Sequence, residues 1–148
     1  MKRIGALPRH LILELIRNGF VRGVSNEDNA RAGSLDLSLS DEVYRVNGAF
    51  LPSPEETVQC AIKRVGGILQ KGEKFHLEKG TCYAIRLNES IDHFPDGVYA
   101  FCNPKSSSGR VDTHVRLLVD RSSRYDAVES SYSGPMWLLV VPKTFPVI

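Results

Sequence analysis

Residues 104–110, Pro-Lys-Ser-Ser-Ser-Gly-Arg, combine two cations, three hydroxyls and a glycine in one short segment. Small hydroxyl donors, backbone N–H groups freed by a glycine and the forked guanidinium of Arg110 all suit phosphate oxygens. The segment therefore predicts an anion-binding site. The alternative is a solvated serine-rich turn between two strands, because short polar turns are common in proteins.

A second chemistry to consider is that of zinc-dependent nucleobase deaminases. These enzymes need a ligating His two residues before a proton-shuttling Glu, together with a Pro-Cys-x-x-Cys pair. His76-Leu77-Glu78 matches the first half of this pattern, but the sequence contains no Cys-x-x-Cys. A zinc ion would lack two of its ligands, so we expect no zinc site and interpret residues 76–78 as part of an alternating surface strand.

The cysteines give no sign of catalysis. Cys60, Cys82 and Cys102 are separated by spacings that fit neither a disulfide framework nor a close-spaced zinc site. Each lies beside apolar residues, and we expect all three to be buried thiols. The sequence also contains no Gly-x-Ser-x-Gly elbow, Walker loop or Gly-x-Gly-x-x-Gly motif.

Composition predicts a globular protein. The 148 residues, 42% hydrophobic and 24% charged, are enough for one domain, residues 1–148, with a single core. No apolar run approaches the roughly 20 residues of a membrane helix, and the N-terminus lacks the apolar block of a secretory signal. The net charge of +2 shows no concentrated nucleic-acid surface. We therefore expect a cytoplasmic protein without a membrane or nucleic-acid partner.

The elements that must position the 104–110 segment are mostly short strands. Apolar residues at helical spacing predict one amphipathic helix near the N-terminus, with Pro8 in its first turn and Asn18-Gly19 at its end. Strict alternation over Ser34–Ser40 predicts a half-buried strand. Further β-rich runs lie at residues 43–46, 68–69, 75–77, 82–87, 98–102, 115–120 and 135–141.

Two further segments near these runs are not predicted as clear strands. Residues 57–65 fit either a strand or a helical turn, and Asn88-Glu89-Ser90 is typical of a turn. Many short strands behind one helix predict a mainly β fold, either a barrel or a sandwich.

Three segments resemble, in order, the signatures of the dUTPase and dCTP deaminase superfamily. They are Ala32–Leu37 with its acidic Asp36, Lys105–Arg110 as the phosphate-binding signature, and Tyr132–Leu138 as an aromatic and glycine turn before a strand. The N-terminal residues 5–19 and the segments 44–52 and 141–146 resemble the start of a dCTP deaminase, especially the longer bacterial form. The resemblance covers nearly the whole chain and is weakest over residues 55–67.

This resemblance implies a distorted dUTPase-like β-barrel of the β-clip type, with one short N-terminal helix, that assembles as a homotrimer with nucleotide sites between subunits. Five residues of one signature would hold the triphosphate: Lys105, Ser106, Ser107, Gly109 and Arg110. Asp36 would lie near the magnesium and phosphate region, and Tyr132 and Gly134 would form the nucleoside turn.

The implied reaction is hydrolytic removal of ammonia from dCTP to give dUTP, in pyrimidine deoxynucleotide metabolism. The enzyme would hydrolyse the C–N bond of a cyclic amidine without zinc, and Mg²⁺ would arrive with the nucleotide triphosphate. The ligand would be dCTP, with dUTP or dTTP as alternatives. In this family a carboxylate in the third signature would take a proton from water and deliver protons to the leaving amine.

The sequence departs from the family at this carboxylate, because Leu139 stands where the glutamate is expected. A leucine neither accepts nor delivers a proton. Glu129 is the nearest carboxylate in sequence, and its use as a substitute base is a hypothesis. Two alternatives therefore stay open: a catalytically silent nucleotide-binding or trimer-stabilising homologue, and a dUTPase-type pyrophosphatase. Family members continue past Ile148, so we expect the chain to be a C-terminally incomplete form of this domain.

Overall fold

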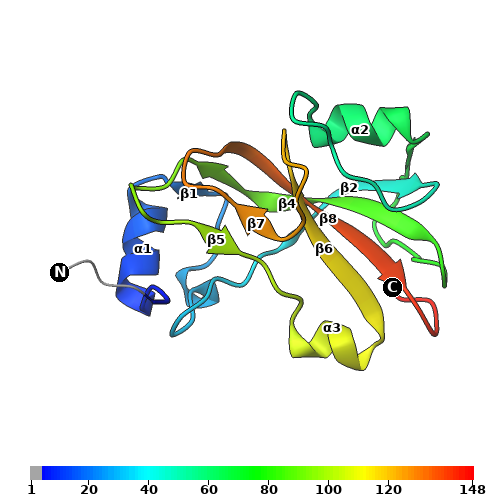
Figure 1. Cartoon of the computed structure of the whole chain (residues 1–148). Coiled ribbons are helices and arrows are strands. Elements are labelled where there is room, and N and C mark those ends of the chain that lie inside the picture. The colour runs from blue at the N-terminus through cyan, green and yellow to red at the C-terminus, as the bar shows by residue number, and fades with distance from the viewer. Residues whose placement is uncertain (1–4) are drawn as a thin grey trace.

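Two long antiparallel strands, β4 (Cys82–Asp92) and β8 (Ser133–Pro142), form the centre of the main sheet. The computed structural model describes residues 5–148, and residues 1–4 of the expected domain lie outside the described residues. β2 (Leu39–Val46) pairs with β4, and β6 (Thr113–Val119) pairs with β8. β3 (Ile68–Leu69) extends the sheet beyond β2, and β1 (Val21–Arg22) pairs with the end of β4. Figure 1 shows this sheet.

The remaining elements surround the sheet. A separate two-stranded sheet consists of β5 (Ala100–Phe101) and β7 (Ala127–Val128). α1 (Arg9–Arg17) and α2 (Val58–Arg64) lie at opposite ends of the molecule, and α3 (Ser106–Arg110) lies between β5 and β6 in the chain (Figure 1). One short 3-10 helix, η1 (Glu27–Asn29), follows β1.

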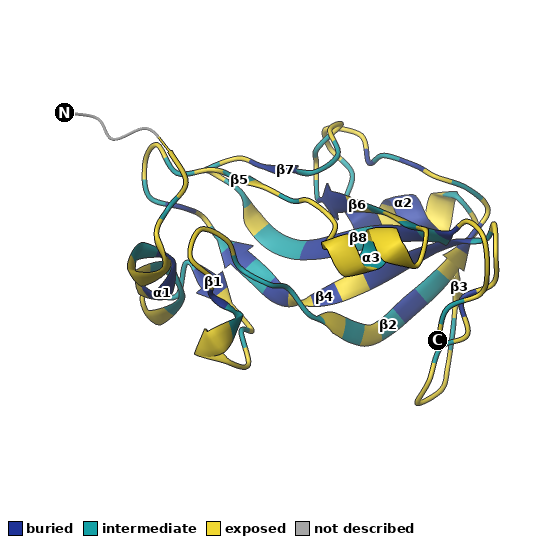
Figure 2. Cartoon of the chain, turned by 90° about the horizontal axis from the view of Figure 1, so that it is seen from below, coloured by how far each residue is buried: buried dark blue, intermediate teal, exposed yellow. Residues whose placement is uncertain are grey.

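Both faces of the central strands are buried because different clusters cover them. On β4, Ala84 packs into a core that α2 closes, whereas its neighbour Tyr83 packs on the other face with Val43 and Leu77. A third cluster, around Leu87 and neighbouring strands, fills the end of the sheet near β1. Burial on both faces explains the nearly continuous apolar sequence at the start of β4. Figure 2 shows dark-blue bands along β4 and β8, with exposed residues alternating in the middle of β4.

The mainly β prediction is confirmed, and the strands of the main sheet are antiparallel. In the described residues the main sheet is an open path that runs β3-β2-β4-β8-β6 and is not closed by pairing between β3 and β6. The N-terminal helix is present as α1, but α2 and α3 are additional helices. Thr57 caps α2 by accepting a hydrogen bond from the N–H of Cys60, which settles residues 57–65 as helical. None of the helices in residues 5–148 is long and apolar enough to cross a membrane.

Two strand predictions are wrong. Residues 34–40 form no regular strand before β2 begins at Leu39; only Leu35 makes an isolated bridge, with Ala30. Their polar groups bond individually to backbone groups of residues 29, 31 and 88 and to the side chains of Arg31, Glu89 and Lys105, so no regular ladder forms. Residues 76–78 are not a strand either, because Leu77 alone bridges to Val147.

The predicted turn at Asn88-Glu89-Ser90 lies instead inside β4. The pairing of β4 with β8 shifts register between Arg86 and Ser90, so the strand continues through an irregular step. Glu89 lies on the same face of β4 as the buried residues Leu87 and Ile91, so its side chain points into the interior, where it is 1% exposed.

Candidate functional site

The 104–110 segment folds as α3, one short turn of helix on the surface. Lys105 precedes the helix in an extended conformation, and its carbonyl accepts hydrogen bonds from the N–H groups of Ser108 and Gly109. Figure 2 shows α3 as largely exposed, and only Ser108 is half-buried. The segment is therefore helical and not the polar turn considered from the sequence, and it presents its hydroxyls and cations to the exterior.

Asp36 holds the cation at the start of this helix. The Lys105 Nζ atom lies 2.8 Å from Asp36 Oδ2, and the Arg31 Nε atom donates to the same oxygen at 3.0 Å. The Lys105 ammonium, followed by the Arg31 guanidinium, lowers the pKa of Asp36 below its usual value. The structure thus brings two of the expected site residues together, Asp36 and Lys105.

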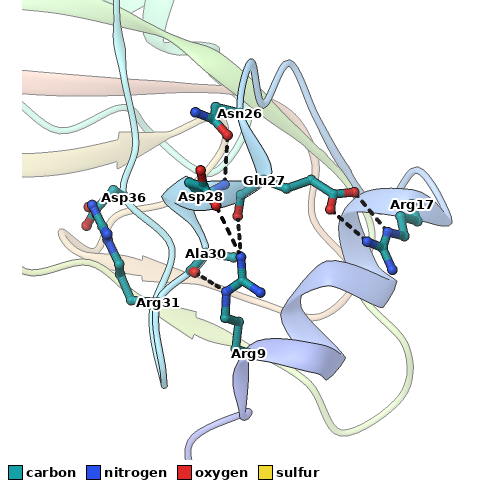
Figure 3. Close-up of polar contacts among 8 residues, drawn as sticks. All are labelled: Arg9, Arg17, Asn26, Glu27, Asp28, Ala30, Arg31 and Asp36. Carbon is teal, nitrogen blue, oxygen red and sulfur yellow. Dashed lines mark hydrogen bonds and ion pairs between the residues drawn. The ribbon is translucent and has the colours of Figure 1, made fainter.

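The segment that leads to Asp36 is fixed against α1, as Figure 3 shows. The Arg17 guanidinium makes two hydrogen bonds to the Glu27 carboxylate, at 2.8 and 2.6 Å, and the Arg9 Nε donates to the Ala30 carbonyl at 2.9 Å. The backbone N–H of Asp36 donates to the carbonyl of Asn29 at 2.9 Å. α1, interpreted from the sequence only as a helix, therefore supports the segment that carries Asp36.

The expected nucleoside turn uses its tyrosine as an internal support. The Tyr132 hydroxyl donates to the Pro135 carbonyl at 2.5 Å and accepts from the Asp120 N–H at 3.2 Å. Burial raises the pKa of Tyr132 to about 12. Gly134 has φ +154°, and a Cβ there would lie 2.7 Å from the Tyr132 hydroxyl oxygen, so this ring requires a glycine at 134.

Leu139 lies in the core that α2 closes and is 4% exposed. The backbone of Leu139 pairs with Ala84 of β4 and with Arg116 of β6. The same cluster contains Trp137, whose buried Nε1 has no hydrogen-bond partner in the described residues. The position at which a catalytic glutamate was expected is therefore occupied by an apolar side chain within a packed interior.

Glu129 lies elsewhere on the surface. Its Oε1 is 3.6 Å from the Arg124 Nη1, and both side chains are exposed. Together with the aromatic rings of Tyr99 and Phe101 they line a cavity of about 240 Å³ on the β5–β7 sheet. None of the residues that line this cavity belongs to α3 or to the Leu139 core, so the structure does not join the hypothetical substitute base to either feature.

The cysteines differ in environment, which corrects the expectation of three buried thiols. Cys82 is buried and Cys102 is half-buried, but Cys60 is exposed on α2. Burial, with a smaller contribution from Asp126, raises the pKa of the Cys102 thiol to about 11. Cys60 is exposed because the inner face of α2 is already formed by Val58, Ala61 and Ile62. Residues 5–148 contain no group of three His, Cys, Asp or Glu side chains arranged to hold a metal ion.

Sequence reasoning missed two residues that organise this region, Arg31 and Glu89. Arg31 shares the Asp36 carboxylate with Lys105, and both Glu89 oxygens accept hydrogen bonds from Ser38. For Glu89 the only local signal in the sequence was the polarity of residues 88–90, and this polarity favours a turn. A buried carboxylate becomes recognisable only when its distant hydrogen-bond donors are known.

The model of the family described as 2'-deoxycytidine 5'-triphosphate deaminase (DCD) N-terminal domain matches residues 3–148. The chain is also similar to the crystal structure of 2'-deoxycytidine 5'-triphosphate deaminase from Agrobacterium tumefaciens, with 32% identity and a TM-score of 0.88. This similarity covers 97% of the present chain and 43% of that chain, so the present chain spans less than half the length of that structure. Comparison with curated proteins gives no match.

Proposed function

The chain belongs to the family of dCTP deaminase N-terminal domains, and from this premise we propose that it binds dCTP as part of an enzyme that hydrolyses dCTP to dUTP and ammonia. One observation carries the proposal: α3 exposes hydroxyls and Arg110, and Asp36 fixes the Lys105 ammonium at its start. Hydroxyls and cations in one short exposed segment suit the oxygens of a triphosphate. The family assignment favours deamination over the pyrophosphatase reaction considered from the sequence.

The triphosphate is bound by residues of α3 and the residue that precedes it. Ser106 and Ser107 are exposed and donate hydroxyl protons to phosphate oxygens, while Arg110 offers the two parallel donors of its guanidinium. Space is open where Gly109 would carry a Cβ, because apart from its chain neighbours and the backbone of its own helix no atom lies within 4 Å of that point. Packing within the chain does not require a glycine there, and close approach of a ligand to the backbone gives a reason for it.

Magnesium is proposed to arrive with the nucleotide. Mg²⁺ keeps several waters and usually takes one or two carboxylates in addition to the substrate phosphates. Asp36 is a carboxylate next to the phosphate-binding segment, and two cations already balance its charge. A magnesium ion held mainly by the phosphates would neutralise part of their charge, and Asp36 is the carboxylate that would lie beside it.

The nucleotide site is proposed to be completed by another chain, in a homotrimer with sites between subunits. The support is the exposure of α3: neither the cavity at Glu129 nor a second cavity at Ser40 to Glu42 is lined by a residue of this helix. A ligand that bound α3 alone would stay open to solvent on its other side. Enclosure of the pyrimidine ring therefore needs groups from outside this surface.

The burial of Leu139 favours a second candidate, in which this domain binds the nucleotide or stabilises the trimer without performing proton transfer. Loss of a proton-transferring group typically removes about 100- to 10,000-fold of rate. Leu139 supplies no such group, and the packed core around it leaves no room for substrate at this position. In this candidate no residue of this chain activates water, and a homotrimer of the chain binds dCTP without deaminating it.

Ammonia release from dCTP in the presence of Mg²⁺ distinguishes the two candidates. Release by the chain alone at the rate of an enzyme would support deamination within this domain. Binding of dCTP without ammonia release would support the silent nucleotide-binding role.

Binding is tested separately by calorimetry with dCTP and with tripolyphosphate. Arg110→Ala is expected to weaken both ligands by about tenfold or more, because a charge-assisted bidentate contact contributes roughly 1.5–3 kcal/mol. Arg45→Ala is the matched control, since Arg45 is an exposed arginine that pairs with Glu78 at 3.2 Å on another part of the surface. Equal affinities for the parent and Arg110→Ala would reject the phosphate-binding assignment.

A further inference from the structure

Glu89 is the one charged side chain that is buried among residues 5–148, with 1% of its surface exposed. A buried carboxylate is unfavourable unless hydrogen bonds compensate for the lost hydration. The proposed binding of phosphate makes no use of it, and its position in the interior therefore needs a separate explanation.

Both oxygens of Glu89 are directed at one residue, Ser38. Oε2 accepts the backbone N–H of Ser38 at 2.9 Å, and Oε1 accepts its hydroxyl at 2.8 Å. The neighbouring Asn88 adds three further bonds: its backbone N–H donates to the Ser38 carbonyl at 3.0 Å, and its side-chain Nδ2 donates to the Ser38 hydroxyl oxygen at 3.1 Å and to the Leu39 carbonyl at 2.9 Å. Every polar group of Ser38 is thus held by the irregular step of β4.

Ser38 is two residues from Asp36, in a segment without a regular ladder. The backbone of Asp36 is fixed on one side by the bond from its N–H to Asn29. On the other side the next polar attachment of the backbone is Ser38, held by Glu89. The position of the Asp36 carboxylate, and with it that of Lys105, therefore depends on two anchors, of which Glu89 provides the more deeply buried.

We propose that Glu89 is a positioning residue for the phosphate site: by holding Ser38 it fixes Asp36 at the distance from which Asp36 holds Lys105 beside α3. The proposal rests on the proposed function only in its consequence for ligand binding. The placement of Lys105 is measurable without any ligand.

The first test measures the reactivity of Lys105 toward a mild acylating reagent: the folded chain is labelled, and the modification of each lysine is quantified by mass spectrometry of its peptides after digestion. Ser38→Ala removes the hydroxyl bond to Glu89 together with the bond from the Asn88 amide, and Glu89→Leu removes both bonds between Glu89 and Ser38. Glu89→Gln keeps an acceptor for the Ser38 N–H and supplies a donor for the hydroxyl oxygen. Lys105 is expected to react about two- to fivefold faster in Glu89→Leu, the change that loss of an exposed ion pair produces. Ser38→Ala should be intermediate, and Glu89→Gln should stay close to the parent.

Lys79 serves as the internal control, because it lies in an exposed turn and the cations paired with Asp36 are Arg31 and Lys105. Its reactivity should be the same in all variants when the temperature is well below each midpoint of unfolding, whereas general loosening of the fold would raise both lysines together. Lys105 reactivity that matches the parent in folded Ser38→Ala and Glu89→Leu would overturn the proposal. If Glu89→Leu does not fold, Ser38→Ala against Glu89→Gln still decides it.

The second test measures the affinity of Mg²⁺-tripolyphosphate by calorimetry on the same variants. We expect about three- to tenfold weaker binding in Glu89→Leu and recovery in Glu89→Gln, because ordering a displaced cation on binding costs free energy. An unchanged affinity, with Arg110→Ala still weakening binding, would overturn the role of Glu89 in ligand binding. If no variant including Arg110→Ala alters binding while Lys105 reactivity responds as expected, the proposed phosphate site fails and the positioning of Lys105 by Glu89 stands.

Discussion

Leu139 of β8 pairs with Ala84 of β4 inside the core that α2 closes, and both residues are buried. This relationship determines what a substitution at Leu139 can do. Restoring a glutamate there would place a carboxylate among apolar side chains, with the unpartnered Trp137 Nε1 as the one buried donor recorded without a bond in the described residues. A glutamate at position 139 would therefore be a buried charge among apolar side chains and not a base in contact with substrate.

We therefore predict that Leu139→Glu destabilises the fold by about 3 kcal/mol or more near neutral pH, since it buries a poorly compensated charge. Burial raises the pKa of such a carboxyl, so the folded state binds a proton more tightly than the unfolded state. The penalty should therefore diminish as the pH falls below the pKa of the folded state and increase as the pH rises. Urea unfolding at a series of pH values measures both effects.

Leu139→Met is the matched control and should cost less than about 1.5 kcal/mol, because it conserves volume and polarity. A Leu139→Glu variant as stable as the parent at neutral pH would contradict the prediction. Ammonia release gained by that variant would show instead that the position is open to substrate.

Gly134→Ala should destabilise the chain by about 1–3 kcal/mol, because the new methyl group meets the Tyr132 hydroxyl oxygen at 2.7 Å. Gly109→Ala is a matched control, since open space surrounds that position and alanine favours a helix over glycine. Removal of the oxygen in a Tyr132→Phe background should reduce the cost of Gly134→Ala. An equal cost in both backgrounds, measured by urea unfolding, would show that the contact is not responsible.

Tyr132 should also make stability sensitive to alkaline pH. Its pKa is raised to about 12 in the folded chain, against an ordinary value near 10, because burial disfavours the phenolate. The folded state keeps the proton longer, so the contribution of Tyr132 is complete below about pH 10 and is lost as pH rises toward 12. Denaturant midpoints between pH 9 and 12 should fall less steeply in Tyr132→Phe than in the parent. Identical slopes would contradict this role of Tyr132.

The strongly patterned elements of the fold could be predicted from sequence, for physical reasons that differ between them. α1 is recognisable because its apolar residues repeat at helical spacing and it ends at Asn18-Gly19. β8 and the start of β4 are recognisable as apolar runs bounded by turns. The alternation over residues 34–40 is equally regular, but alternation predicts a strand only where a partner backbone is available. Only the carbonyl of Ser38 bonds to a partner backbone, at Asn88, whereas its N–H and hydroxyl bond to the Glu89 side chain.

The candidate site was predictable in composition but not in geometry. The residue types of 104–110 indicate anion binding, yet their helical conformation depends on hydrogen bonds to the Lys105 carbonyl that the polar sequence does not favour. The pairing of Asp36 with Lys105 joins positions 69 residues apart, and no local pattern encodes it. Glu89 was interpreted as part of a turn because the donors that satisfy it lie on Ser38, in a distant part of the sequence.

The exposure of the Cys60 thiol predicts which cysteine reacts first in the folded chain. Cys60 should react first with an aromatic disulfide reagent near neutral pH, because it is exposed on α2, whereas burial raises the pKa of Cys82 and Cys102 and keeps both thiols protonated. One thiol should therefore be modified rapidly in the folded chain, and this rapid phase should disappear in Cys60→Ser. Rapid modification of Cys102 in the folded Cys60→Ser variant would contradict the burial found here.

Asp36 should have opposite effects on phosphate binding with and without magnesium. Its carboxylate competes with a bare polyphosphate for Lys105 and repels it, so Asp36→Asn should bind metal-free tripolyphosphate about two- to fivefold more tightly, the range of an exposed ion pair. With Mg²⁺ present the same carboxylate faces a cation, and Asp36→Asn should bind more weakly than the parent. Asp28→Asn is the matched control, because Asp28 is an exposed carboxylate on η1 whose Oδ1 lies 3.5 Å from the Arg9 Nη2. Calorimetry in excess chelator and in excess Mg²⁺ measures both arms, and a change of the same sign in both would show that Asp36 does not lie beside the bound metal.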